Sequence, residues 1–88
     1  MTTAPIRFID LTRDVLDASA VMIVGEDVWR RLRAIGVSRE SGMLIVAMAN
    51  PDDLAAIKEI EIRTGLAVFA TRAEEADIIA AIGRSYER

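Results

Sequence analysis

The segment Trp29–Arg33 combines the chain's only tryptophan with three arginines, and these side chain types are suited to recognition. An arginine guanidinium is a planar fork of donors that binds carboxylates, phosphates and guanine edges. Tryptophan and arginine are also frequent among the residues that dominate protein–protein affinity. Trp29, Arg30, Arg31 and Arg33 are therefore candidate contacts for a protein partner, and the three arginines are alternatively candidate contacts for a nucleotide. In the competing interpretation, Trp29 covers the edge of the core and the arginines point into water.

Ile62 is a further candidate contact. On the helix expected over Asp52–Thr64, the apolar residues Leu54, Ile57 and Ile60 cluster on one side. Ile62 lies about 140° from Ile57 around the helix axis, outside a narrow core stripe. It is then either an exposed contact for a partner, or a buried residue on a helix that the first helices cover on a second side.

Three pairs of adjacent carboxylates are the remaining candidates for catalysis or metal binding: Glu26-Asp27, Asp52-Asp53 and Glu74-Glu75. Each pair lies at the start of an expected helix, where the free N–H groups and the helix dipole favour acids. Adjacent helical residues point about 100° apart, so no pair converges on one substrate atom. The chain has no cysteine and no histidine, and it lacks both G-x-x-x-x-G-K-[ST] and G-x-G-x-x-G. The sequence therefore predicts a domain that is not an enzyme and holds no metal.

Length and composition predict a single domain over residues 1–88, with residues 1–7 as a loose lead-in. The 88 residues are 52% hydrophobic and 28% charged, which is typical of a small globular domain. The net charge of −3 argues against binding to nucleic acid or to an anionic membrane surface. Apolar stretches such as Met43–Ala49 are far shorter than the ~20 residues of a membrane span, and no secretory signal is evident. We expect a cytoplasmic domain.

Glycine, proline and acidic residues indicate where the helices and strands begin and end. Gly25 ends a first short helix, and a second one begins at Glu26 with Val28, Leu32 and Ile35 as its apolar stripe. Asn50 caps a later helix that Gly65 ends. The expected helices are Leu16–Val24, the helix from Glu26, Asp52–Thr64 and Glu74–Tyr86, and the expected strands are Ala34–Arg39, Met43–Met48 and Leu66–Thr71.

These elements predict a fold of the α/β (α+β) class in the order α-α-β-β-α-β-α. The turn Glu40-Ser41-Gly42 makes the first two strands an antiparallel hairpin, with Gly42 at a position that needs positive φ. The strand–helix–strand unit that follows makes a parallel pair. Met43–Met48 is apolar on both faces, as in a central strand that is covered on both sides. The result is a three-stranded mixed sheet with helices packed on it.

Several segments together resemble the N-terminal domain of type II secretion and type IV pilus assembly ATPases. The chain reads L-I-V-A-M-A-N-P-D-D-L-A-A-I from Leu44 to Ile57, T-G-L-A-V from Thr64 to Val68 and A-A-I-G-R-S-Y from Ala80 to Tyr86. The segment F-I-D-L at residues 8–11 is similar to the beginning of that domain. The resemblance covers residues 8–88. Gly25 and Gly36 stand where the family has prolines.

The resemblance implies a non-catalytic module. In that family the domain precedes a P-loop motor and docks it onto inner-membrane platform proteins, and some members bind cyclic di-GMP. Residues 1–88 contain neither the motor nor the N-terminal helical segment that carries the first nucleotide-binding repeat. We therefore expect an excised domain or a stand-alone adaptor that binds a bacterial protein, either a secretion or pilus platform or a regulator of motility and polarity. The alternative is a cyclic di-GMP sensor that uses Arg30, Arg31 and Arg33.

For the adaptor, composition favours the Trp29–Arg33 helix as the partner-binding surface over the start of the Asp52–Thr64 helix. Tryptophan and arginine supply contact area and directional hydrogen bonds, whereas Asp52, Asp53 and Glu59 are typical of a solvated face. Ile62 and the last helix come next as candidates.

Overall fold

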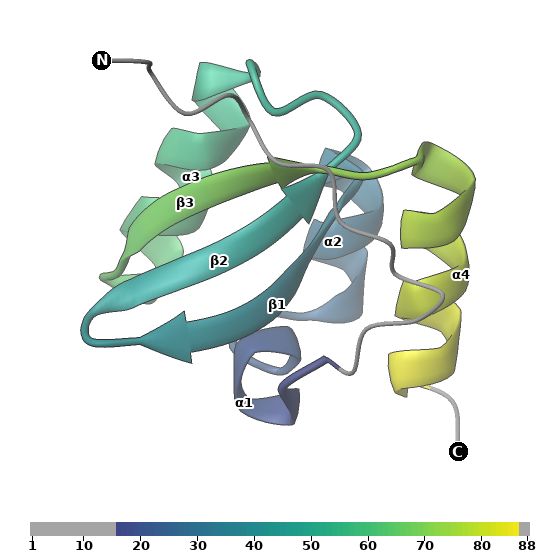
Figure 1. The fold of residues 1–88 in the computed structure, drawn as a ribbon, viewed down its shortest axis with the longest axis horizontal. Helices are drawn as coiled ribbons and strands as arrows, with labels where there is room; N and C mark the ends of the chain where they lie inside the picture. Colours follow the sequence, from purple (N-terminus) through teal and green to yellow (C-terminus); the bar gives the residue numbers. More distant parts are fainter. Residues whose placement is uncertain (1–15, 87–88) are drawn as a thin grey trace, which may run out of the picture.

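The computed structural model describes residues 16–86, so the expected lead-in and the F-I-D-L segment lie outside the described residues. The seven elements follow the predicted order. They are α1 (Ala18–Val21), α2 (Glu26–Leu32), β1 (Ala34–Glu40), β2 (Met43–Met48), α3 (Leu54–Thr64), β3 (Ala67–Arg72) and α4 (Glu75–Tyr86), as Figure 1 shows.

The three strands form one mixed sheet in the order β1-β2-β3. β1 runs antiparallel to β2, and β2 runs parallel to β3, which confirms the predicted fold class and both predicted pairings. The hairpin turns at Ser41 and Gly42, whose φ angles are 46° and 78°. Two successive positive φ angles define the type I′ turn that matches the twist of a two-residue hairpin.

The helices pack around this sheet in two groups. α1, α2 and α4 contact β1, α4 also contacts β2, and α3 contacts β3. Figure 1 shows α2 and α3 behind the sheet, with α4 beside α2. The core between them is aliphatic apart from one indole ring, and its largest fully buried side chains are Trp29, Ile35, Leu44, Met48, Ile60, Ile78, Ile82, Val21 and Val46. The central strand β2 is buried along most of its length, as its apolar pattern predicts.

The first two helices are shorter than predicted. α1 covers only Ala18–Val21, because the carboxylate of Asp17 accepts a hydrogen bond from the Ser19 N–H and caps the helix there. α2 ends at Leu32, and Ile35, which we placed on its apolar stripe, lies instead in β1 with its side chain fully buried. The chain passes from helix to strand within the single residue Arg33.

Close packing of α1 on β1 depends on Gly36. A β-carbon at this position would lie 2.3 Å from the carbonyl oxygen of Ala20, which is far below a van der Waals contact. The glycine therefore lets the backbone of α1 approach the strand directly. None of the helices within residues 16–86 is long and apolar enough to cross a membrane.

Candidate functional site

Trp29 belongs to the core and not to the surface. Its side chain is fully buried, and its indole N–H donates to the carbonyl oxygen of Val21 over 2.8 Å. The hydroxyl of Tyr86 lies 2.9 Å from the same oxygen and 2.8 Å from that of Val24, and burial raises the pKa of this phenol. The tryptophan thus fixes the α1–α2 loop, and its predicted contact with a partner does not fit this structure.

The three arginines of the predicted surface point to three different acids. Arg30 pairs with Glu26 one turn earlier on α2, with 2.8 Å between Nε and Oε2. Arg31 reaches across to Glu59 on α3, and Arg33 pairs with Glu75 on α4 at 2.9 Å. The arginines remain 43–60% exposed, but the structure does not gather them into one anion-binding group.

Glu59 is the centre of the charge network that joins α2 to α3. It accepts two hydrogen bonds from the Arg31 guanidinium, one of them 3.1 Å from Nη1 to Oε1, and a third bond of 2.9 Å from Arg63 Nε. These bonds lower the pKa of Glu59 from 4.5 to about 2, and the bonds to Glu59 raise the pKa of Arg31. The spacing of Glu59 and Arg63 by four residues was visible in the sequence, whereas the bond to Arg31 depends on the tertiary fold.

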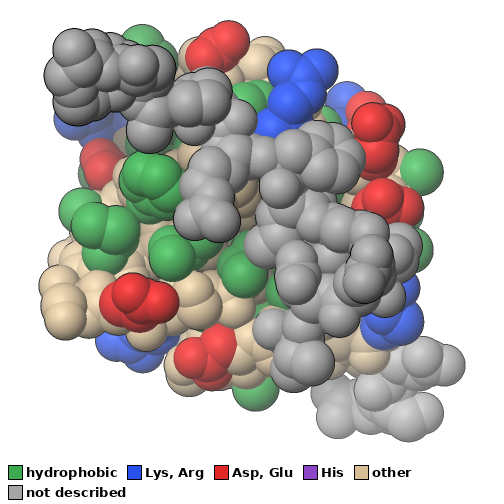
Figure 2. All heavy atoms as spheres, viewed as in Figure 1, with side chains coloured by type: hydrophobic (Ala, Val, Ile, Leu, Met, Phe, Trp, Pro, Cys, Tyr) green, Lys and Arg blue, Asp and Glu red, His purple; other side chains and the backbone are tan. Residues whose placement is uncertain are grey.

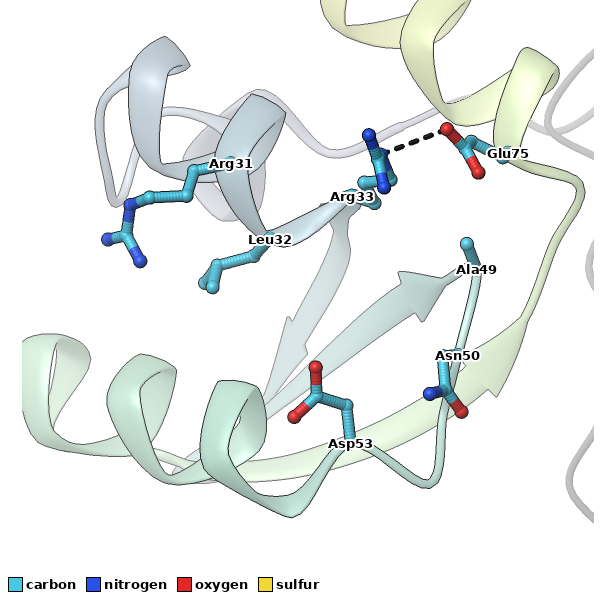
Figure 3. A pocket seen from close by; sticks show the side chains of 7 residues that line it. All are labelled: Arg31, Leu32, Arg33, Ala49, Asn50, Asp53 and Glu75. Atoms are coloured by element: carbon cyan, nitrogen blue, oxygen red, sulfur yellow. Dashed lines mark ion pairs between the residues drawn. The ribbon is translucent and has the colours of Figure 1, made fainter.

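An open pocket of about 360 Å³ lies where α2 ends, β2 ends and α3 and α4 begin. Its lining residues are Arg31, Leu32, Arg33, Ala49, Asn50, Asp53 and Glu75 (Figure 3). This is the carboxyl edge of the parallel strands, the edge at which open α/β sheets bind ligands. That rule was the signal by which Asn50, Asp53 and Glu75 could have been found from the sequence.

The charges of this pocket balance. Figure 3 shows the Arg31 and Arg33 side chains pointing away from each other, with the Arg33 guanidinium turned to Glu75. Arg33 is held there by a left-handed backbone, with φ at 54°, which ends α2 and turns the chain into β1. Asp53 supplies a second carboxylate, whose Oδ1 accepts the Ala56 N–H and caps α3. A bound anion must therefore compete with carboxylates that already occupy or face both guanidinium groups.

The outer face of α3 carries the two most exposed large apolar side chains among the described residues. Ile62 is 76% exposed and Leu54 is 75% exposed, so the interpretation of Ile62 as an exposed residue is the correct one. The opposite side of the helix buries Ala56 and Ile60 against the core. Asp53, and not Asn50, caps this helix, which begins at Leu54, two residues later than predicted.

Residues 16–86 contain no group of three or more acids that could hold a metal ion. Within the same range, no buried side-chain nitrogen or oxygen lacks a hydrogen-bond partner. The buried polar side chains of these residues are thus occupied by structural contacts, and none of them points unpaired into a cavity.

Comparison with known proteins places the chain in a family. The MshEN domain matches residues 4–88. The structure of MshE with cdg (cyclic di-GMP) superimposes with a TM-score of 0.85 at 30% identity, over 92% of this chain and 59% of that one. The N-terminal domain of XpsE superimposes with a TM-score of 0.78 at 20% identity, over 92% of this chain and 57% of that one. No curated protein sequence matches.

The chain thus spans less than two thirds of the length of either solved structure. The MshEN match extends over nearly the whole sequence and agrees with the resemblance that its motifs carry. The protein belongs to the MshEN domain family, the N-terminal domain type of type II secretion and type IV pilus ATPases.

Proposed function

We propose that this domain is a non-catalytic docking module that binds a bacterial protein partner in the cytoplasm. The partner is a platform component of a secretion or pilus machine, or a regulator of motility and polarity. The observation that carries the proposal is the outer face of α3, where Leu54 and Ile62 are three-quarters exposed although the domain has a complete core elsewhere. Apolar side chains that recur on one helix face give a partner helix a surface to pack against.

The distribution of charge supports the same proposal. Two of the three candidate arginines, Arg31 and Arg33, are used in ion pairs with Glu59 on α3 and Glu75 on α4. The proposed surface comprises the exposed arginines of α2, Arg30, Arg31 and Arg33, together with the neighbouring outer face of α3 that carries Ile62. Arginines at the rim of an apolar contact guide association and select the partner.

A direct binding measurement tests this function. Residues 1–88 are titrated by calorimetry with purified cytoplasmic fragments of type II secretion and type IV pilus platform proteins, and with polarity regulators. We expect at least one fragment to bind with a Kd in the micromolar range or tighter, which corresponds to a binding free energy of about −8 kcal/mol. Failure of every fragment to bind, together with binding of a small ligand, would replace the docking function by a sensing function.

The second candidate function is cyclic di-GMP sensing, which the likeness to MshE with cdg favours. The residues of this chain nearest to such a role are Arg31 and Arg33 at the open pocket. Against it stand Glu59 and Glu75, which hold these arginines in ion pairs that a phosphate would have to break.

Thermal unfolding with excess cyclic di-GMP separates the two functions. A ligand present at 100 times its Kd stabilises the folded state by about 2.7 kcal/mol, which raises the Tm of a domain of this size by more than 10 °C. From the ion pairs we expect no shift at millimolar nucleotide. A shift that Arg33→Ala abolishes would establish the sensing function.

A further inference from the structure

We propose that the outer face of α3 binds a helix of the partner that carries a carboxylate midway between two aliphatic side chains. This inference rests on the proposed docking function and specifies the chemistry of the partner. It follows from three residues of α3, Leu54, Lys58 and Ile62, which recur every four residues along one outward stripe.

The two aliphatic ends of this stripe are more exposed than any other large apolar side chain in residues 16–86. Leu54 and Ile62 expose 75% and 76% of their surface, whereas the other exposed large apolar residues, Met22, Met43 and Phe69, expose 51%, 40% and 44%. Eight residues of helix separate the pair by roughly 12 Å. A second helix lying along α3 has the same rise per residue, so its positions i and i+8 meet both ends of the stripe.

The middle of the stripe is a cation without a counter-ion. Lys58 is the only lysine of the chain. The four ion pairs found within residues 16–86 involve Arg30, Arg31, Arg33 and Arg63, and none involves Lys58. The complement of an unpaired ammonium group between two aliphatic side chains is a carboxylate at position i+4 of the partner helix.

The same lysine argues against a second copy of this chain as the occupant. Lys58 lies midway between Leu54 and Ile62, so a pairing of two α3 helices through this stripe sets one Lys58 against the other in either direction. Like charges in direct opposition disfavour association. An acidic partner helix meets no such repulsion.

The hydrophobic side chains that gather over the sheet in Figure 2 lie on the face of the sheet away from α3. Met43 and Phe69 share one face of the sheet, because Phe69 pairs with Ile45, two residues after Met43, and both are exposed whereas Leu44 and Val46 on the other face are buried. They provide a matched control: two exposed apolar residues that the proposed contact does not use.

The test compares variants of residues 1–88 in calorimetric binding to the platform or regulator fragment that binds the unmodified domain. Leu54→Gln with Ile62→Gln keeps good helix formers on α3 and removes both apolar ends, and we expect the Kd to rise at least tenfold. Lys58→Glu is expected to raise the Kd to a similar degree. Replacing the facing carboxylate residue of the fragment with lysine is expected to restore binding to this variant. Met43→Thr with Phe69→Thr is expected to leave the Kd within threefold. Circular dichroism melts verify that each variant is folded.

Each result decides between the two proposals. If no fragment binds the unmodified domain, the docking function fails and this inference fails with it. If a fragment binds and the α3 variants leave its Kd unchanged, or the sheet variants weaken it equally, docking stands and the α3 stripe is wrong. A concentration-dependent dimer in sedimentation, abolished by Leu54→Gln with Ile62→Gln, would overturn the acidic helix as the occupant.

Discussion

The carboxylate of Glu59 accepts hydrogen bonds from arginines on two helices, and these bonds lower its pKa to about 2. A group whose pKa is lower in the folded state stabilises the fold while it is ionised. This stabilisation is complete above the ordinary pKa of 4.5 and is lost as the pH falls toward about 2. We therefore predict that Glu59→Gln lowers the free energy of unfolding at pH 7. Between pH 4.5 and 2, the free energy of unfolding of this variant should fall less than that of the unmodified domain.

Urea denaturation at pH 7, 4, 3 and 2.5 checks this prediction. Glu74→Gln is the matched control, because Glu74 is exposed and takes part in none of the ion pairs within residues 16–86. A Glu59→Gln variant with the same pH dependence as the unmodified domain would show that the bonds to Arg31 and Arg63 do not hold in solution.

Individual side chains were the part of the site that the sequence predicted least well. Arg30, Arg31 and Arg33 are neighbours in sequence, but successive helical residues point about 100° apart, and Arg33 has left the helix. Arg30 pairs within α2, whereas the partners of Arg31 and Arg33 on α3 and α4 are fixed only by the packing of those helices. Trp29 was ambiguous because the tertiary fold also supplies its partner. Its indole N–H can be buried only because the carbonyl oxygen of Val21 lies beside it.

At the scale of elements, the hairpin between β1 and β2 has a turn residue that does not favour its conformation. Ser41 has a φ of 46°, and asparagine and aspartate are the residues most frequent before glycine in a type I′ turn. We predict that Ser41→Asn stabilises the domain by about 0.5 kcal/mol, because asparagine adopts positive φ more readily. Ser38→Asn within β1 is expected to be neutral or destabilising. Equal effects of both substitutions in chemical denaturation would rule out this explanation.

Two glycines in regular elements should respond in opposite directions to alanine. At Gly36 the added methyl group meets the backbone of Ala20 at 2.3 Å, so α1 must move away from β1, at a cost of about 2 kcal/mol or more. At Gly83, inside α4, the nearest atom is the Arg30 guanidinium at 4.0 Å, and the better helix former should add up to about 1 kcal/mol. Thermal unfolding of both variants shows whether each substitution stabilises or destabilises the domain. Destabilisation by Gly83→Ala would contradict the open packing there.

The boundaries of elements were predictable where local chemistry alone determines them. β2 was predicted with its observed ends, because it is an uninterrupted apolar run between a turn and a helix cap. α3 begins later than predicted because two residues, Asn50 and Asp53, are both able to cap, and only the path of the chain selects Asp53. The start of α1 had a local signal that the prediction missed, because Asp17 can cap the helix through the Ser19 N–H.

For the whole molecule, the sheet topology followed from rules that need no tertiary detail. A short turn with glycine requires an antiparallel pair, and a helix between two strands favours a parallel one. What these rules do not determine is which helix face remains without a neighbour. The exposure of Leu54 and Ile62 emerges only from the assembled fold, in which α1, α2 and α4 pack on β1 and α3 packs on β3.

The two ends of the described chain are joined through one carbonyl oxygen. The carbonyl oxygen of Val21 faces both the Trp29 indole N–H and the Tyr86 hydroxyl. The same hydroxyl also lies beside the carbonyl oxygen of Val24. We predict that Tyr86→Phe lowers the free energy of unfolding by about 1 kcal/mol, the net value of a typical buried hydrogen bond. Val21 keeps the tryptophan as a donor in that variant. Its carbonyl is left unpaired only when Trp29→Phe is combined with Tyr86→Phe.

A double-mutant cycle in urea therefore should not be additive. A buried carbonyl without a donor costs more than the loss of one of two donors, so the double variant is expected to lose at least about 0.5 kcal/mol more than the sum of the single variants. Phe69→Leu, which alters an exposed ring, is expected to stay within about 0.5 kcal/mol of the unmodified domain. Additive single and double variants would mean that the α1–α2 loop and the end of α4 are stabilised independently of each other.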